Sequence, residues 1–208
     1  MIEDCRGADF RIETDRLVIR GWKPDDGKPF AELNADPRVM TYFPRCLKAE
    51  ETLAMIGKLR EKIAADGFTF MPVEEKGSGR FVGIVGLNRP VFPQPVSIAP
   101  CVEIGWRLTP ATWGRGYATE AARAWLRFGF ETLRLDEIVA FTVVTNECSR
   151  AVMRCLGMTE RGHFDHPSVP EDRSDLKVHV LYRMKSVDWK GASNGKGKGA
   201  DGDRQDPM

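Results

Sequence analysis

The sequence contains little of what a disulfide framework or a structural zinc site requires. Its 208 residues include five cysteines, an odd number, and no two cysteines are separated by only two residues. Small secreted domains and zinc sites depend on paired or closely spaced cysteines. We therefore expect a cytoplasmic protein that has reduced cysteines and binds no metal.

Long apolar runs and an excess of charge of one sign are also absent. No stretch of about 18 apolar residues occurs, and no charged N-terminal segment precedes an apolar one, so neither a membrane span nor a signal peptide is predicted. Lysine and arginine total 31 against 30 acidic residues, a net charge of +1. This balance provides no long-range field for nucleic acid or an anionic membrane, and neither is an expected partner.

The chain reads as one folded unit. Hydrophobic residues make up 42% of the sequence, and no second hydrophobic block separates two domains. Residues 190–208 contain five glycines but no aromatic residue and no Val, Ile or Leu, so they are predicted to form a disordered tail. We expect a flexible N-terminus over residues 1–10 and a single domain over residues 11–189.

Hydrophobic periodicity alternates between strand-like and helix-like segments. Strands are predicted over residues 16–20, 68–73, 80–87, 102–108, 137–144, 159–164 and 178–184. Helices are predicted over residues 24–34, 49–65, 118–133 and 147–156. Four prolines in residues 90–100 predict a loop over one end of the sheet, where a substrate could bind. The expected class is α+β, with mixed α and β order.

A glycine-containing turn joins the strand ending at Leu108 to the helix beginning near Ala118. Gly114 and Gly116 permit positive φ, so successive amides can point at one anion while the helix N-terminus adds partial positive charge. The motif matches neither a P-loop nor a dinucleotide turn. A diphosphate would fit here, although a lone Gly-x-Gly can also serve turn geometry alone.

The strand over residues 102–108 offers a candidate catalytic carboxylate. Period-two alternation places Glu103 and Gly105 on one face and Ile104 on the other. Glycine within a strand often marks a close approach by a ligand or another backbone, which would give Glu103 a cavity to face. A solvated strand glutamate is the alternative.

A second candidate lies at the start of the helix over residues 147–156. Asn146 is placed to cap this helix, which makes Ser149 its third residue. The serine is either an inert part of the cap or a hydrogen-bond donor to a reacting group. Cys148 beside it is an alternative nucleophile, because a helix N-terminus can lower a thiol pKa.

The motifs together resemble the GNAT N-acetyltransferase superfamily, in particular its Rim-type branch of ribosomal-protein N-terminal acetyltransferases, over about residues 11–189. The matching segments are Glu13-Thr-Asp-Arg-Leu-Val-Ile-Arg20, Val102-Glu-Ile-Gly-Trp-Arg-Leu108, Trp113-Gly-Arg-Gly-Tyr-Ala-Thr-Glu-Ala121, and Asn146 followed by Ser149 and Leu156-Gly-Met158. The resemblance implies a twisted, mixed, largely antiparallel sheet flanked by helices. Its fourth and fifth strands would splay apart and admit the pantetheine arm of acetyl-CoA.

The resemblance also implies roles for individual residues. Glu103 would be the general base and Ser149 the proton donor to the departing sulfur, at a position where many members have tyrosine. Ala111 departs from the Gln or Arg that members often have three residues before the first glycine. The implied acetyl-CoA-binding residues are Ile104, Leu108, Gly114, Arg115, Gly116, Tyr117, Ala118, Thr119 and Asn146.

The reaction that this resemblance implies is direct acetyl transfer in a ternary complex, without a metal. The acceptor would be a primary amine, either a protein N-terminus or a small molecule, and the protein would be a monomer or a homodimer. Two alternatives are an acyl-enzyme mechanism through Cys148 and a module that binds acetyl-CoA without catalysis. Retention of both Glu103 and Ser149 argues against such a sensor.

Overall fold

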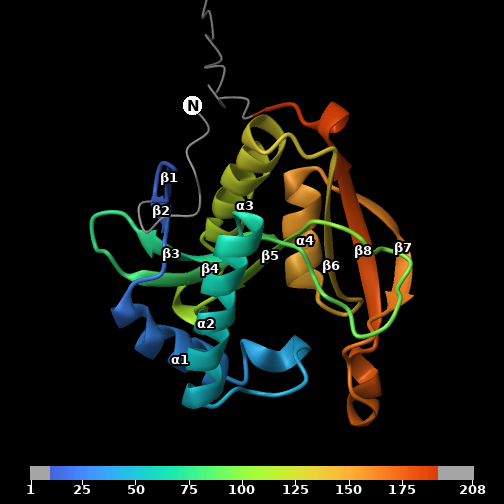
Figure 1. Ribbon diagram of the computed structural model, residues 1–208, viewed down its shortest axis with the longest axis horizontal. Coiled ribbons are helices and arrows are strands. Elements are labelled where there is room, and N and C mark those ends of the chain that lie inside the picture. Colours follow the sequence, from blue (N-terminus) through green and yellow to red (C-terminus); the bar gives the residue numbers. More distant parts are fainter. Residues whose placement is uncertain (1–9, 192–208) are drawn as a thin grey trace, which may run out of the picture.

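One sheet runs through the computed structural model, which describes residues 10–191 (Figure 1). Over these residues it has eight strands in the order β1-β2-β3-β4-β5-β6-β8-β7. The strands are β1 (Arg11–Glu13), β2 (Leu17–Arg20), β3 (Phe70–Glu75), β4 (Phe81–Asn88), β5 (Glu103–Leu108), β6 (Glu137–Val143), β7 (Thr159–Asp165) and β8 (Val178–Lys185). The mixed α and β fold is confirmed.

Helices cover both faces of this sheet. The four α-helices are α1 (Gly27–Ala35), α2 (Ala49–Asp66), α3 (Tyr117–Arg127) and α4 (Glu147–Leu156). The short helices are η1 (Pro24–Asp26), η2 (Met40–Tyr42), η3 (Pro110–Thr112), η4 (Phe128–Thr132), η5 (Glu171–Leu176) and η6 (Ser186–Asp188). Among the helices of residues 10–191, none is long and apolar enough to cross a bilayer.

The main core lies between the sheet and helices α3 and α4. Trp125 of α3 is fully buried there and stacks on Phe10, with ring centroids 5.3 Å apart. Phe10 is the last residue of the predicted flexible N-terminus; residues 1–9 and 192–208, including nearly all of the predicted tail, lie outside the described residues. The same core also contains side chains from strands in both halves of the sheet.

The opposite face is covered in two parts. Helices α1 and α2 pack on β4 through a second cluster that includes Phe30, Ile56 and Ile84. The proline-rich loop contributes Ile98 to a third cluster with Val139 of β6 and Leu181 of β8. Figure 1 shows α2 and this green loop on the same side of the sheet. The loop predicted over residues 90–100 thus packs on β6 and β8, on the side of the sheet that carries α2.

All neighbouring strands are antiparallel except β5 and β6. These two strands are parallel, and their register has the single pair Glu103↔Val139. By contrast, β5 pairs with β4 along its whole length, and β6 pairs with β8 in the same way. The two central strands consequently diverge beyond Glu103, as the family resemblance predicted.

Two local features differ from the sequence-based prediction. Within the helix predicted over residues 118–133, the α-helical part ends at Arg127. The following residues form one π-helical turn, η4. Within that turn Gly129 lies so close to β6 that a Cβ would be 2.7 Å from Ile138 Cδ1. Strand β1 was not predicted because it has only three residues.

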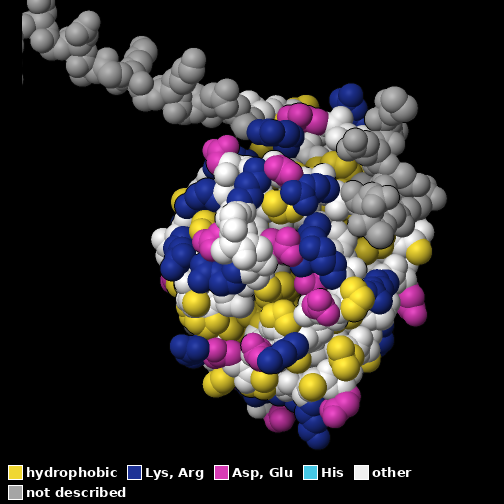
Figure 2. Space-filling model, turned by 90° about the vertical axis from the view of Figure 1, so that its left-hand side faces the viewer, with side chains coloured by type: hydrophobic (Ala, Val, Ile, Leu, Met, Phe, Trp, Pro, Cys, Tyr) yellow, Lys and Arg dark blue, Asp and Glu magenta, His cyan; other side chains and the backbone are white. Residues whose placement is uncertain are grey.

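Figure 2 shows cationic and anionic side chains interspersed over the face at the β1–β2 side.

Two glycines provide a matched test of this packing. A Cβ on Gly86 of β4 would lie 2.1 Å from the Thr69 carbonyl oxygen, whereas a Cβ on Gly57 of α2 would have nothing within 4 Å. Gly86→Ala is therefore expected to lower the free energy of unfolding by about 3 kcal/mol. Gly57→Ala should raise it by about 0.5–1 kcal/mol, because alanine favours the helix. Urea denaturation measures both, and equal effects would contradict the packing described.

Candidate active site

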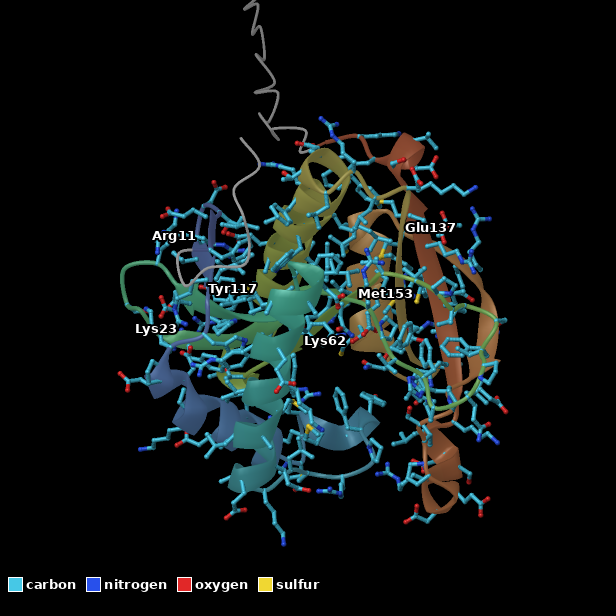
Figure 3. The ribbon with its side chains drawn as sticks, in the orientation of Figure 1. Arg11, Lys23, Lys62, Tyr117, Glu137 and Met153 are labelled. Carbon is cyan, nitrogen blue, oxygen red and sulfur yellow. The ribbon has the colours of Figure 1, made fainter. Side chains whose placement is uncertain are left out.

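The divergence of β5 and β6 opens a cleft of about 570 Å³. Its walls come from α2, α4 and the strands β3, β4, β5, β6 and β8, together with the segments after α1, between β4 and β5, and between β7 and β8. Lys62 on α2 and Met153 on α4, both labelled in Figure 3, line it from different sides of the sheet. The cleft therefore passes through the sheet where the strands separate.

Four of the predicted site residues line this cleft. Glu103 and Ile104 come from β5, and Asn146 and Ser149 from the start of α4. The other predicted cofactor-binding residues lie elsewhere, on the turn into α3 or at the buried end of β5. They are Leu108, Gly114, Arg115, Gly116, Tyr117, Ala118 and Thr119.

Glu103 is a largely desolvated carboxyl group at the point where β5 and β6 part. Its Oε1 accepts a hydrogen bond from Asn88 Nδ2 at 2.6 Å. Burial raises the pKa of Glu103 to about 7, against the smaller lowering effects of the Asn88 hydrogen bond and the Lys62 charge. The carboxyl group is thus partly buried and lines the cleft, which favours the catalytic reading over a fully solvated strand glutamate. Near neutral pH this carboxyl exchanges a proton readily.

Gly105, two residues after Glu103 on the same strand face, lies close to a protein side chain. A Cβ on Gly105 would lie 2.9 Å from Cε1 of Phe70, whose ring fills the adjacent space. The ring and Gly105 both line the cleft. Gly105 therefore makes room for the Phe70 ring, and Glu103 faces a cavity as expected.

The start of α4 is organised by a side-chain cap. Asn146 Oδ1 accepts a hydrogen bond from the Ser149 amide at 3.2 Å, and its Nδ2 donates to Thr142 Oγ1 of β6 at 3.0 Å. The predicted cap is confirmed, with Ser149 as the third helical residue. No described protein group hydrogen-bonds to the Ser149 hydroxyl, which leaves it available to a reacting group. Cys148 is exposed and does not line the cleft.

The turn into α3 has an open backbone. Gly114 and Gly116 adopt φ of 73° and 75°, and no side chain caps the helix at Gly116. The first-turn amides of Tyr117, Ala118 and Thr119 donate to no acceptor within residues 10–191, as is usual for a helix without a cap. Amides arranged in this way, at the positive end of a helix dipole, suit a phosphate or diphosphate.

Side-chain contacts fix the position of this turn but leave its backbone exposed. The Tyr117 hydroxyl donates to Glu75 Oε1 at 2.6 Å, which anchors the start of α3 to β3. Arg16 lies with its guanidinium carbon 4.7 Å from the centre of the Tyr117 ring and donates to the Arg115 carbonyl at 2.9 Å. Residues 114–116 remain exposed.

The backbone of β5 presents a free edge towards the gap. Thr109 donates its amide to Val82 of β4, while the Val102 carbonyl accepts from Val139 of β6. Because backbone groups alternate sides along a strand, the amides of Ile104, Trp106 and Leu108 face β6. The Leu108 carbonyl accepts from the Trp113 indole at 2.9 Å. Beyond the single β5–β6 pair, the Trp106 amide has no strand to pair with.

Several cleft residues were not anticipated from sequence. Asn88 lies directly opposite Glu103 in the β4–β5 register, and Lys62 and Arg107 also line the cleft. The long loop between β4 and β5 concealed that register, because a hairpin register follows from sequence only when the turn is short. In the described part of the chain, no group of three or more His, Cys, Asp or Glu residues is arranged to hold a metal ion.

Comparisons with known proteins agree with this geometry. An uncharacterized N-acetyltransferase of Bacillus subtilis, YnaD, is 31% identical over 156 residues, which are 74% of this chain and 86% of the relative. The solved structure of a GNAT-family acetyltransferase from Bacillus anthracis has a TM-score of 0.71 and 27% identity, and the match covers 86% of this chain and 99% of that one.

The fold also matches a ribosomal-protein-S5-alanine acetyltransferase from Vibrio fischeri, with a TM-score of 0.67 and 20% identity over 88% of this chain and 100% of that one. The sequence pattern described as an acetyltransferase (GNAT) domain matches residues 16–159, more than half of the chain. The resemblance inferred from the motifs is thus confirmed: the chain belongs to the GNAT family of acetyltransferases.

Proposed function

We propose that this acetyltransferase moves the acetyl group of acetyl-CoA directly to a primary amine, with Glu103 as general base and Ser149 as proton donor. One observation carries the proposal. Glu103, whose pKa is raised to about 7, lies in the same cleft as the free hydroxyl of Ser149. A base whose pKa is near the working pH is well suited to accept the proton of an amine.

The residues present fit acetyl-CoA. The open amides of Tyr117, Ala118 and Thr119 suit the diphosphate, and the β5 edge around Trp106 suits the amide groups of a pantetheine arm. Acetyl-CoA, when bound, supplies a thioester carbonyl as the electrophile. The Trp106 amide is the backbone donor that we assign to the carbonyl oxygen as negative charge develops there.

In the proposed reaction, the proton lost by the amine and the proton gained by the sulfur each have a named partner. The amine nitrogen forms a bond to the carbonyl carbon, the carbon–sulfur bond breaks, and the amine proton passes to Glu103. Ser149 donates a proton to the departing sulfur and regains one from solvent. Holding both reactants in one cleft supplies much of the acceleration. The position of Cys148 outside the cleft gives no support to an acyl-enzyme route.

Replacement of the base gives the most direct test. Glu103→Gln is expected to lower kcat by about 10²–10⁴, the usual contribution of a general base. In the wild type, kcat/KM should rise with pH through about 7 as the carboxyl group loses its proton, and this limb should vanish in the variant. A free-thiol assay over pH 5–9 (roughly two units either side) measures both.

Two controls separate catalysis from folding in that test. Glu61→Gln, at an exposed position of α2, should retain the wild-type profile.

The second control is protein stability. The pKa of Glu103 is raised from 4.5, so its contribution to stability is present below 4.5 and is lost as pH rises through about 7. Glu103→Gln should therefore be more stable than wild type at alkaline pH. Unchanged activity in this folded variant would refute the assignment.

The leaving-group step is tested at two adjacent residues of α4. Ser149→Ala should lower kcat about 100-fold, with little change in the KM for acetyl-CoA, because the hydroxyl acts mainly in the transition state. Cys148→Ala should keep wild-type kcat, since the thiol is exposed and outside the cleft. The opposite pattern, together with acetyl-enzyme detected by mass spectrometry, would replace direct transfer by the acyl-enzyme mechanism.

The diphosphate site is tested by placing an acid in the first turn of α3. Thr119→Asp should keep the thermal stability, because an acid favours a helix N-terminus. It should also raise the Kd for CoA at least about tenfold through repulsion of the diphosphate. Ala49→Asp, in the first turn of α2, is the matched control and should not change the Kd. Isothermal titration gives both values, and equal Kd values would place the diphosphate elsewhere.

A further inference from the structure

The proposed chemistry does not use Arg107, a cationic side chain that lines the cleft. It lies on β5 four residues after Glu103 and on the same face. Its Nη1 donates to Asn34 Oδ1, and its guanidinium carbon lies 4.1 Å from the centre of the Phe43 ring. Its Nε is buried without a hydrogen-bond partner. Within residues 10–191, Arg107 forms no ion pair with any carboxylate.

This side chain is held in a fixed position. Asn34 is fully buried, donates to Thr52 Oγ1 at 3.2 Å and accepts the Leu47 amide on its backbone carbonyl at 2.9 Å. Helices α1 and α2 therefore orient the one side chain that hydrogen-bonds to Arg107. The Phe43 ring supports the flat face of the guanidinium, an arrangement that stabilises a cation.

The charge of Arg107 is poorly compensated. Burial lowers its pKa to about 10, so the group still carries its charge near neutral pH. A guanidinium has five N–H donors, and within residues 10–191 this one makes a single hydrogen bond. A buried charge without a counter-ion is destabilising, and a bound carboxylate removes much of that cost through paired, charge-assisted hydrogen bonds.

The rest of the cleft has the same sign of charge. Lys62 and Arg89 also line it, whereas Glu103 is the carboxylate among its lining residues. Two histidines, His166 and His179, line it as well, and burial lowers the pKa of both, which leaves them neutral near pH 7. A second ammonium group on an acceptor would meet repulsion here, whereas an anionic group would be attracted.

We propose that the acceptor is an amine that carries a carboxylate, and that Arg107 binds this carboxylate while the amine lies at Glu103. The inference rests on the proposed function and names its substrate class. Four residues of extended strand separate the two Cα atoms by about 13 Å. The carboxylate is therefore several bonds from the reacting nitrogen, as in an ω-amino acid.

Matched amines test this specificity. Each ω-amino acid, from glycine to 6-aminohexanoate, is compared with the n-alkylamine of equal length, and free thiol is measured. The wild type should prefer the longer amino acids at least about tenfold in kcat/KM. Arg107→Met should remove the preference through a higher KM for amino acids, with the alkylamine values unchanged. Arg107→Lys should restore part of it, and Arg60→Met, exposed on α2, should leave it intact.

Equal kcat/KM values for each pair in the wild type, or a preference that survives Arg107→Met, would overturn the inference. So would efficient acetylation of a peptide amide that has no carboxylate, at the level of the amino acids. Titration of 6-aminohexanoate into the CoA complex gives a second readout without turnover. If 6-aminohexanoate binds in an Arg107-dependent way but no amine is acetylated, the proposed function is refuted and the inference is not. If 6-aminohexanoate does not bind and no amine is acetylated, both are refuted.

Discussion

The single pair that joins β5 to β6 is the constraint on which the rest of the site depends. Every other neighbouring pair in the sheet is antiparallel, but α3 connects β5 to β6 and returns the chain in the same direction. Because pairing stops at Glu103↔Val139, the β5 edge beyond it keeps free backbone groups, and the space between the strands becomes the cleft. Further pairing would close the cleft.

The same desolvation acts on two groups of opposite charge. It raises the pKa of Glu103 and lowers that of Arg107, since burial disfavours whichever form is charged. Neither group has an ionic partner at hydrogen-bonding distance in the described structure; Glu103 has Asn88 and Arg107 has Asn34. Two neutral amides thus position these two ionisable groups of the cleft, and both groups are left able to interact with a ligand.

Local sequence was sufficient where short-range geometry decides the structure. The cap at Asn146, the strand containing Glu103 and the glycine turn at Gly116 all follow from spacing and backbone preferences, and all are found. What sequence alone did not provide were partners set by tertiary register. Asn88 reaches Glu103 only because a long loop returns β5 against β4. Arg107 becomes notable only because its hydrogen-bond partner is the neutral Asn34 and no carboxylate of residues 10–191 forms an ion pair with it.

The neutral partner of Glu103 is what suits it to the role of general base that we propose. An arginine or lysine hydrogen-bonded to it would stabilise the carboxylate, and each unit by which the pKa fell would correspond to about 1.4 kcal/mol of that stabilisation. Such a carboxylate would be ionised at neutral pH but too weak a base to take a proton from an amine. Asn88 fixes the orientation of the carboxyl group while burial keeps its pKa high. The more distant charge of Lys62 moderates that rise, which leaves the pKa close to neutrality.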